Sequence, residues 1–484
     1  MNLVLINPNA NIEKSQGKYS IFGTAMPPMG LAYLATLLYL KGFKIYVIDQ
    51  YVTKISNEQL LEEIKQRNPC LVGISCLTAA MSNVETIVSG IQKLQLNTKI
   101  VLGNIHATLF AEELLADNMA DIIVRGEGEG SFLELAENIT EGKEYFHIEG
   151  ISYRNSAQVI HNPDREPVNL DENPFPLWEL LPYEKYNSVP LLGVDNEVML
   201  HIQASRGCPY KCFFCSQEAM HKKVRIRKVK NVVDEMELQS KKYNVNKFAF
   251  VDSYFPMTKE YGMTFAEEMI RRGLHKKIKW ATETRVDKVD YELLKKLKEA
   301  GLNLIMYGFE SGAQEILDGV NKDITIEQSK ISMEYTRRLK IPSLGFFILG
   351  LPGENRDTIK KTIKFSQELD CDLVKFNIAI PTPGSKFFQD WRLKAGKGNL
   401  VPEKFSSWYS PKKGEDIVYS PEGISSKEME SLRAKAMIDY YFRLKIILRS
   451  FLKRTISFQN ICKGAFVLMS ELLLICVQRM DLRR

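Results

Sequence analysis

The sequence predicts an α/β protein with two strand–helix units: an N-terminal doubly wound parallel sheet of Rossmann-like type, then a partial (β/α)6 barrel and a C-terminal helical tail. Two observations favour this fold class. Short apolar strands alternate with helical stretches twice along the chain, and the short links between them are typical of parallel sheets. A proline-rich stretch, NPFPLWELLP, lies between the two series. We therefore expect a first domain over 1–140, a linker over 141–195, a barrel over 196–400 and a helical region over 401–484.

The first series begins with the strand LVLIN and alternates regularly. Its other expected strands are 43–49, 70–75 and 99–103, with a fifth in DIIVRGEGEG, and its expected helices are 29–42, 57–67, 81–94 and about 107–118. Ligands of such sheets bind at the carboxyl ends of the strands. The loops there are INPN, SCLT, GNIHAT and RGEGEG. GEGEG never completes a G-x-G-x-x-G dinucleotide motif, so a scaffold without ligand remains an alternative.

The second series follows an extended segment over 146–186. Its expected strands are 201–205, 247–253, 278–285, 303–310, 342–350 and 373–381, and its expected helices are 232–242, 259–272, 291–300, 326–340 and 356–369. In barrels of this kind the catalytic groups lie at the carboxyl ends of the strands. That rule points to the loop after residue 205 and to Asp252, Arg285, Glu310 and Glu354.

Composition limits the class of protein. With 484 residues, 45% hydrophobic and 26% charged, the chain is typical of a soluble protein of two or three domains. Eight cysteines are too few for a disulfide scaffold, and MNLVLINPNA has no signal-peptide pattern, so we expect the cytoplasm. The net charge of +6 belongs to the segment after residue 427, so a nucleic-acid-binding core is not indicated.

Three cysteines lie close together in SRGCPYKCFFCS: Cys208, Cys212 and Cys215. Their spacing favours an iron–sulfur cluster with one iron left open for a substrate. A structural zinc would need a fourth ligand, for which His201 or His221 is available, and free thiols are the third alternative.

The spacing C-x-x-x-C-x-Φ-C after the first barrel strand resembles the radical SAM superfamily. FVDSYF, GFESG, GFFILGLPGE and PTPGS resemble further motifs of that family, although Ser253 replaces its second Asp in the first of them. The resemblance implies a 4Fe–4S cluster that binds and reductively cleaves S-adenosylmethionine (SAM) to a 5′-deoxyadenosyl radical. It also implies SAM contacts for Asp252, Arg285 and Glu310, and contacts near the adenine for Gly345 and Glu354. A structural ion pair between Arg285 and Glu310 is the alternative.

The first 140 residues resemble the cobalamin-binding domain that precedes the barrel in one radical SAM class. That class includes methyltransferases and proteins like the anaerobic magnesium-protoporphyrin monomethyl ester cyclase. The resemblance implies cobalamin contacts for Ser75, Thr78, Gly103, Gly126 and Glu127. The D-x-H-x-x-G motif of other cobalamin proteins is absent, and we expect His106 to be a hydrogen-bonding loop residue rather than a cobalt ligand.

The tail after residue 427 is helical in pattern and rich in Lys and Arg, with a second, apolar helix expected over 464–477. This helix is too short and too charged to span a membrane. We expect the tail to pack on the barrel; the alternative is a basic amphipathic helix that touches a membrane surface, which would suit a lipid-like substrate.

The sequence thus predicts a cobalamin-dependent radical SAM enzyme that methylates an unactivated carbon of a small-molecule or lipid-like substrate. Radical cyclisation without methyl transfer is the alternative reaction, and a non-catalytic iron–sulfur protein is the alternative class. The family resemblance implies a flavodoxin or ferredoxin as electron donor.

Overall fold

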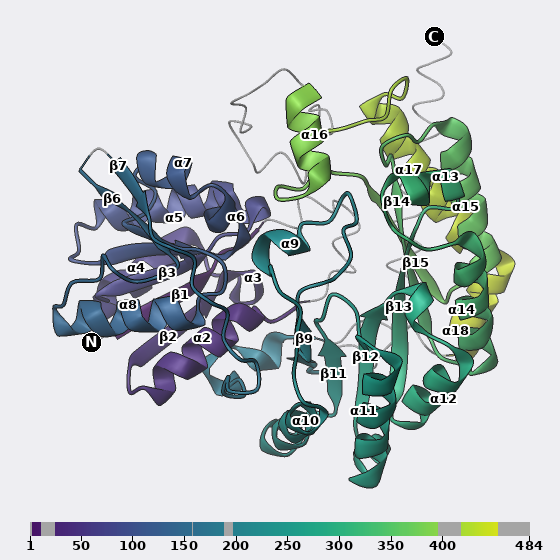
Figure 1. Ribbon diagram of the computed structural model, residues 1–484, viewed down its shortest axis with the longest axis horizontal. Helices are drawn as coiled ribbons and strands as arrows, with labels where there is room; N and C mark the ends of the chain where they lie inside the picture. Colours follow the sequence, from purple (N-terminus) through teal and green to yellow (C-terminus); the bar gives the residue numbers. More distant parts are fainter. Residues whose placement is uncertain (1, 11–24, 157, 188–196, 395–417, 454–484) are drawn as a thin grey trace.

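The computed structural model describes residues 2–10, 25–156, 158–187, 197–394 and 418–453. The chain folds into two α/β units, each built on its own sheet, with the N-terminal unit at the left of Figure 1 and the barrel at the right. The predicted fold class is confirmed.

The first sheet has the order β2-β1-β3-β4-β5-β6-β7. Its strands are β1 (Asn2–Asn7), β2 (Lys44–Asp49), β3 (Leu71–Ser75), β4 (Lys99–Gly103), β5 (Ile122–Val124), β6 (Ile151–Asn155) and β7 (Gln158–His161). β1 to β5 are parallel, and the strand order reverses direction between β1 and β3. A reversal of this kind is where doubly wound sheets bind ligands.

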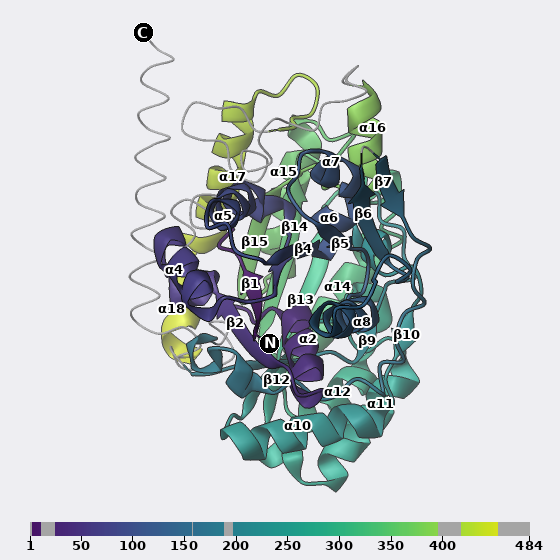
Figure 2. The ribbon, with the colours of Figure 1, turned by 90° about the vertical axis from the view of Figure 1, so that its left-hand side faces the viewer.

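Helices cover both faces of this sheet. They are α2 (Met29–Leu40), α3 (Gln50–Thr53), α4 (Asn57–Arg67), α5 (Met81–Lys93), α6 (Asn104–Leu109), α7 (Ala111–Ala116) and α8 (Glu129–Glu141). Figure 2 shows α4 and α5 on one face, and α2 and α8 pack together on the other. α4, α5 and α7 bury apolar side chains on one face and α2 and α8 on the other, so the sheet lies between two separate apolar cores.

Two expectations in this unit differ from the structure. The helix expected over 107–118 is two short helices, because the chain turns at Phe110, whose ring is buried under the sheet. The extended segment over 146–186 contains the hairpin β6–β7, which pairs antiparallel with β5. The free edge of β5 supplies hydrogen-bond partners that the local sequence cannot disclose.

The barrel sheet has the order β15-β14-β13-β12-β11-β8, and all of its strands are parallel. The strands are β8 (Leu200–Ile202), β11 (Lys247–Phe250), β12 (Lys279–Thr284), β13 (Leu302–Glu310), β14 (Ser343–Leu349) and β15 (Leu373–Ile378). The helices are α10 (Val229–Tyr243), α11 (Lys259–Arg271), α12 (Tyr291–Glu299), α13 (Gln314–Gly319), α14 (Ile326–Arg338) and α15 (Arg356–Leu369). The predicted six strand–helix repeats are confirmed.

Side chains alternate between the two faces of the barrel strands. The outward-facing side chains form the main core against the helices, whereas Met199, Ala249, Ala281, Leu304 and Met306 form a small apolar layer inside. Side-chain caps begin several of the helices, with capping boxes at α14 and α15. Short 3-10 helices are η2 (Thr78–Ala80), η3 (Trp178–Leu180), η4 (Tyr183–Lys185), η5 (Leu274–Lys276) and η6 (Val286–Lys288).

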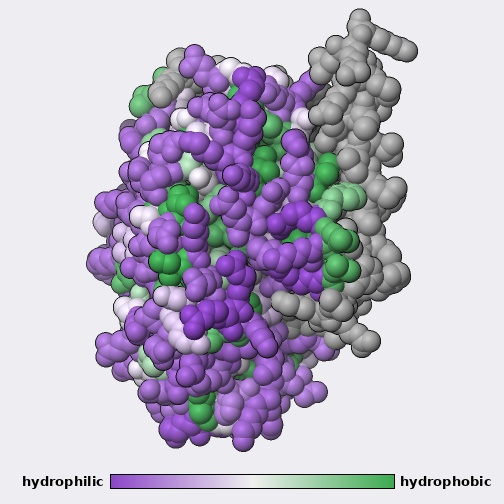
Figure 3. Space-filling view, turned by 90° about the vertical axis from the view of Figure 1, so that its right-hand side faces the viewer, coloured by the Kyte–Doolittle hydropathy of each residue, from purple (hydrophilic) through white to green (hydrophobic). Residues whose placement is uncertain are grey.

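The C-terminal helices are α16 (Lys386–Lys394), α17 (Ser426–Tyr441) and α18 (Leu444–Lys453). α17 packs on β15 and α15, and the hydroxyl of Tyr440 donates to the carbonyl of Cys371 at 2.5 Å. This part of the tail therefore flanks the barrel, whose outer surface is mainly hydrophilic (Figure 3). The apolar helix expected over 464–477 lies outside the described residues. No helix within the described part of the chain is long and apolar enough to cross a bilayer.

Candidate functional site

The three clustered cysteines lie in one loop. It follows β9 (Ser205–Arg206), which pairs antiparallel with β10 (Arg225–Ile226), and it leads into α9 (Gln217–Met220). Gly207 opens the loop with φ +89°, and a Cβ there would lie 2.7 Å from the carbonyl oxygen of Lys223, so only glycine fits. The Phe213 amide donates to Val320 and its carbonyl accepts from Phe387. The loop is thus held to the barrel on two sides.

Cys208, Cys212 and Cys215 are half-buried free thiols. Burial raises the pKa of each thiol, and the nearby charge of Lys322 acts in the opposite direction on all three, as Arg285 does on the first two. Among the described residues, no three His, Cys, Asp or Glu side chains converge on a single metal ion. In a 4Fe–4S cluster each thiolate ligates a different iron, so such a cluster needs no common point. The donor set therefore fits the cluster and does not fit the zinc alternative.

The two histidines considered for zinc are placed elsewhere. His201 is buried on β8, where burial lowers its pKa to about 4. His221 Nδ1 lies 2.9 Å from Glu127 Oε1 of the N-terminal unit. Neither histidine is therefore needed as a metal ligand, and the cysteine loop supplies three protein ligands.

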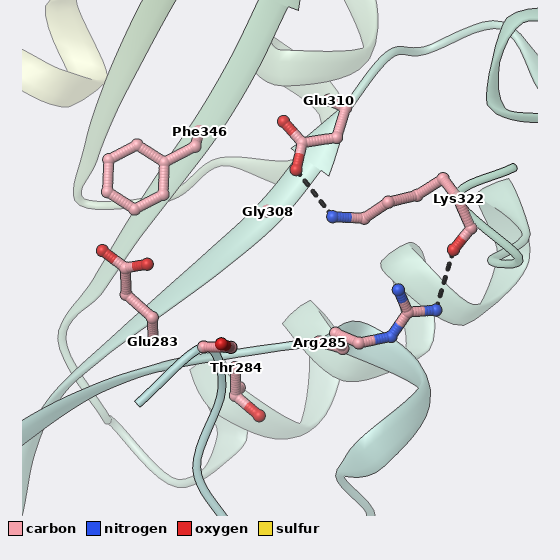
Figure 4. A pocket seen from close by; sticks show the side chains of 8 residues that line it. Glu283, Thr284, Arg285, Gly308, Glu310, Lys322 and Phe346 are labelled. Atoms are coloured by element: carbon pink, nitrogen blue, oxygen red, sulfur yellow. Dashed lines mark hydrogen bonds and ion pairs between the residues drawn. The ribbon is translucent and has the colours of Figure 1, made fainter. Parts of the chain in front are cut away.

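A cavity of about 280 Å³ opens beside the cysteine loop, at the carboxyl ends of β11 to β14 (Figure 4). Its walls are formed by Ser253, Glu283, Thr284, Arg285, Gly308, Glu310, Lys322 and Phe346. The buried ammonium of Lys322 donates to Glu310 at 2.6 Å. Six of the eight lining residues, all except Gly308 and Phe346, carry a charged or hydroxyl group, so the cavity suits a polar, zwitterionic ligand.

The backbone of the GFESG stretch leaves room for the ion pair between Glu310 and Lys322. Glu310 has φ +63°, and the register between β13 and β14 shifts between Gly308 and Glu310. A Cβ on Gly308 would lie 2.5 Å from the Glu310 carboxylate and 3.0 Å from Lys322 Nζ. Left-handed backbone at a non-glycine residue is costly and clusters at functional sites. The glycine thus makes room for the Glu310–Lys322 ion pair.

Arg285 also lines the cavity, but most of its donors are engaged. Nε donates to Asp287 at 2.8 Å and one Nη to the carbonyl of Lys322 at 2.8 Å. Its guanidinium stacks 3.5 Å from the centre of the Tyr210 ring, which belongs to the cysteine loop. The structure therefore contains neither an Arg285–Glu310 pair nor a freely available Arg285; this side chain joins the cysteine loop to the loop after α13.

Three other sequence-predicted residues lie around the cavity without lining it. Asp252 accepts from the Ala204 amide at 3.0 Å and from the Ser205 hydroxyl, and burial raises its pKa to about 6. Glu354 accepts from the amides of Gly350 and Leu351. A Cβ on Gly345 would contact Cys371 and Phe309, on the outer face of the sheet. Asp252 thus supports the start of the cysteine loop, and Glu354 supports the loop after β14.

The residues predicted to contact cobalamin gather at the carboxyl edge of the first sheet. Ser75 accepts from Asn104 at 2.9 Å and pairs in register with Gly103. The Thr78 hydroxyl lies 3.1 Å from Nδ1 of the buried His106, and the Gly126 amide donates to Thr108. His106 thus makes the expected hydrogen bond, but it lies in helix α6 and not in a loop.

Glu127 has a different set of contacts from its neighbours. It pairs with Arg206, which is buried and directly precedes Gly207, and with Arg225 and His221. Burial raises the pKa of Glu127, but the hydrogen bond from His221 and the charges of the two arginines outweigh this and lower it to about 2. Arg206 also pairs with Glu129 at 2.6 Å. This buried cluster ties the loop after β5 to the chain that enters the cysteine loop, while α9 packs on α6 (Figure 1).

Sequence reasoning did not identify Lys322, Glu283 or Arg206. Lys322 lies in a loop twelve residues after its partner Glu310, where nothing local marks it. Glu283 has a weak signal, because in KWATET it alternates with Trp280 and Thr282, which are buried. Inward-facing charge on a barrel strand is a pattern worth searching for.

The comparisons with known proteins agree with this geometry. The sequence profile of the radical SAM superfamily matches residues 202–366, and that of the B12 binding domain matches residues 21–136. An uncharacterized methyltransferase of Pyrococcus horikoshii is 31% identical over 89% of this chain and 91% of its own length. An anaerobic magnesium-protoporphyrin IX monomethyl ester cyclase of Rubrivivax gelatinosus is 31% identical over 81% of this chain and 70% of its own.

Among solved structures, the radical SAM methyltransferase TsrM of Kitasatospora setae, with cobalamin and a 4Fe–4S cluster bound, has a TM-score of 0.67 at 20% identity. The match covers 83% of this chain and 76% of that one, and it shows a shared fold.

Fold and site together define an iron–sulfur protein whose cluster is presented at the mouth of a partial barrel. The chain belongs to the radical SAM superfamily, in the group whose barrel follows a B12-binding domain. Its cofactors are a 4Fe–4S cluster, SAM and cobalamin, as the sequence predicts.

Proposed function

We propose that the protein is a cobalamin-dependent radical SAM methyltransferase that acts on an unactivated carbon of a small molecule. The observation that carries the proposal is the buried link from Glu127 and Glu129 to Arg206, because it fixes the edge of the B12-binding domain next to the cysteine loop. Cobalamin bound at the edge of the B12-binding domain and the cluster bound by the cysteine loop could then both act on a single substrate bound between them.

The cofactors supply the reactive groups: SAM bound at the reduced cluster provides a 5′-deoxyadenosyl radical, and cobalamin provides a methyl group for transfer. The protein's own residues bind and orient. Cys208, Cys212 and Cys215 would each hold one iron. Lys322 is a better candidate than Arg285 to bind the SAM carboxylate, because Arg285 is engaged by Asp287 and backbone carbonyls.

The remaining site residues divide between two tasks under this proposal. Glu310 and Glu283 would accept hydrogen bonds from the amino or ribose groups of SAM, while Asp252 and Glu354 hold the loops that frame the cavity. Ser75, Thr78, Gly103 and Gly126 would contact cobalamin at the edge of the first sheet. The domain limits 1–140, 141–195, 196–400 and 401–484 are proposed on the same basis, with the hairpin β6–β7 assigned to the first unit.

Radical cyclisation without methyl transfer is the second candidate reaction. The relative of Rubrivivax gelatinosus is named a cyclase and has the same identity to this chain, 31%, as the methyltransferase of Pyrococcus horikoshii, over a smaller share of both chains. The experiment that decides uses full-length protein, expressed anaerobically with cobalamin and reconstituted with iron and sulfide. We expect one cobalt and about four irons per chain after gel filtration, and label from methyl-labelled SAM in an organic product. Formation of 5′-deoxyadenosine without labelled product would favour cyclisation; no 5′-deoxyadenosine would refute both.

A small flavodoxin or ferredoxin is proposed as reductant. Peripheral membrane contact is proposed for the tail, since α18 exposes Leu444 and Leu448 beside Lys445 and Arg449. Truncation before α17 would remove Met429, Ala436 and Tyr440 from the core. The suitable test is therefore co-sedimentation of the whole chain and of its Leu444→Glu/Leu448→Glu variant with anionic vesicles, with which the variant should pellet less. Equal pelleting of both with neutral vesicles, or of neither with anionic ones, would contradict the proposal.

A further inference from the structure

Lys375 points into the barrel from its last strand. Along β15, Val374 and Phe376 are buried in the outer core, so Lys375 between them faces the other side. In register it pairs with Phe346 of β14, which lines the cavity, and Leu373 two residues earlier packs on the inner apolar layer. Lys375 therefore lies above an apolar floor and next to the cavity wall.

The ammonium of Lys375 has no hydrogen bond or ion pair with any residue that the structure describes. The same holds for the carboxylate of Glu283 on β12, which Figure 4 shows projecting into the cavity toward Phe346. Other charges of the cavity are paired within the described residues, Lys322 with Glu310 and Arg285 with Asp287. Lys375 and Glu283 are both exposed, so a ligand that enters the open lumen can reach their charged groups.

The charges of Lys375 and Glu283 interact across the lumen of the barrel. Desolvation by the surrounding protein lowers the pKa of Lys375, and the charge of Glu283 raises it again. Desolvation and the charge of Glu310 raise the pKa of Glu283, and the charges of Lys322 and Lys375 lower it. Within the described residues the two groups form no ion pair, and Lys375 lies next to Phe346 in the wall of the cavity that Glu283 lines.

We propose that Lys375 binds an acidic group of the substrate, so that the enzyme acts on an organic anion whose apolar part rests on the floor formed by Ala281, Leu304 and Met306. The inference deepens the proposed function, on which it rests. A carboxylate and a phosphonate or phosphate share the required chemistry, and either would replace the missing partner of the ammonium.

The test measures acetylation of Lys375 by acetic anhydride, site by site, in the whole reconstituted protein by peptide mass spectrometry. Hexanoate, hexylphosphonate and the neutral hexanamide are the probes. We expect either anion to slow acetylation of Lys375 about fivefold or more and hexanamide to leave it unchanged. Lys364, on the exposed side of α15, is the internal control and should react equally throughout. Stronger protection by hexanoate indicates a carboxylic acid substrate, and stronger protection by hexylphosphonate indicates a phosphorylated one.

Equal protection by hexanamide, no protection by either anion, or full protection by SAM alone would overturn the proposal; the last result would assign Lys375 to SAM. Equilibrium dialysis of labelled hexanoate gives a second readout, in which K375Q should bind about tenfold more weakly and K375R and K364Q close to wild type. Formation of 5′-deoxyadenosine by the same wild-type preparation tests the proposed function separately. Its absence would refute that function, whereas its presence without anion binding would refute only the role of Lys375.

Discussion

Arg206 Nη1 lies 2.7 Å from Glu127 Oε2, so two residues before the first cluster cysteine the barrel is bound to the loop after β5 of the N-terminal unit. Both side chains are almost completely buried, at 5% and 7% exposure. Buried pairs contribute little net stability but are strongly destabilising when one partner is lost, because the other charge stays buried alone. The pair therefore acts as a positional constraint between the two cofactor-binding units.

Glu127→Gln should weaken the contact between the loop after β5 and the start of the cysteine loop. It removes the carboxylate shared by Arg206, Arg225 and His221 and is expected to lower the free energy of unfolding by about 3 kcal/mol. Hydrogen exchange, followed by mass spectrometry over residues 205–227, should become faster. Glu166→Gln is the control, because Glu166 is 82% exposed in its pair with Lys223 and its loss should leave both quantities unchanged. Unchanged exchange in Glu127→Gln would refute the constraint.

Cys212→Ala should abolish SAM cleavage, because the cluster loses one of its three protein ligands. Iron content after reconstitution and 5′-deoxyadenosine formation are the two measurements, and both should fall to background. Cys70→Ala, outside the loop and half-buried directly before β3, should retain both. Normal 5′-deoxyadenosine formation by Cys212→Ala would show that the loop does not hold the cluster.

Gly308→Ala should impair SAM binding while leaving the cluster intact. The added methyl group would fall 2.5 Å from the Glu310 carboxylate and would push it away from Lys322. We expect SAM affinity, measured by equilibrium dialysis, to fall about tenfold or more through loss of a charge-assisted contact. The matched control is Gly319→Ala at the end of α13, where a Cβ meets nothing within 4 Å. If both variants bound SAM equally well, the ion pair would have no part in the SAM site.

Glu354→Gln should change how stability depends on pH. Burial raises the pKa of Glu354 to about 7 from 4.5, so the folded protein binds this proton more tightly than the unfolded chain does. Protonated Glu354 therefore makes its full contribution to the free energy of unfolding, about 3 kcal/mol, below about pH 4.5. This contribution is lost as the pH rises to about 7. Glutamine keeps an acceptor for the amides of Gly350 and Leu351 but cannot titrate.

Urea unfolding of both proteins at pH 5 and pH 8 measures the effect. The variant should gain stability relative to wild type at the higher pH, and titrations common to both proteins cancel in the comparison. Glu315→Gln, an exposed glutamate on α13, should show the same difference from wild type at both values. A difference for Glu354→Gln that does not change with pH would contradict the raised pKa.

Much of the fold was predictable because it rests on local patterns. The helix over Asn57–Arg67 and the strand over Lys99–Gly103 have the predicted limits, since caps, glycine stops and apolar periodicity all lie within these segments. The hairpin Ile151–His161 was not predicted, because its polar strands depend on the free edge of β5. The helix over 107–118 was divided by the burial of Phe110, which is a tertiary effect.

The candidate site divides in the same way. By itself the sequence determined the three cysteines and the strand ends that bear Glu310 and Arg285, because covalent spacing and strand periodicity are local. Only the tertiary structure decided that Glu310 pairs with Lys322, that Arg285 stacks on Tyr210 and that Glu127 binds Arg206. The physical reason is that an ion pair depends on which charges meet in a buried space, and residues 79 positions apart, as Glu127 and Arg206 are, meet only after the chain has folded.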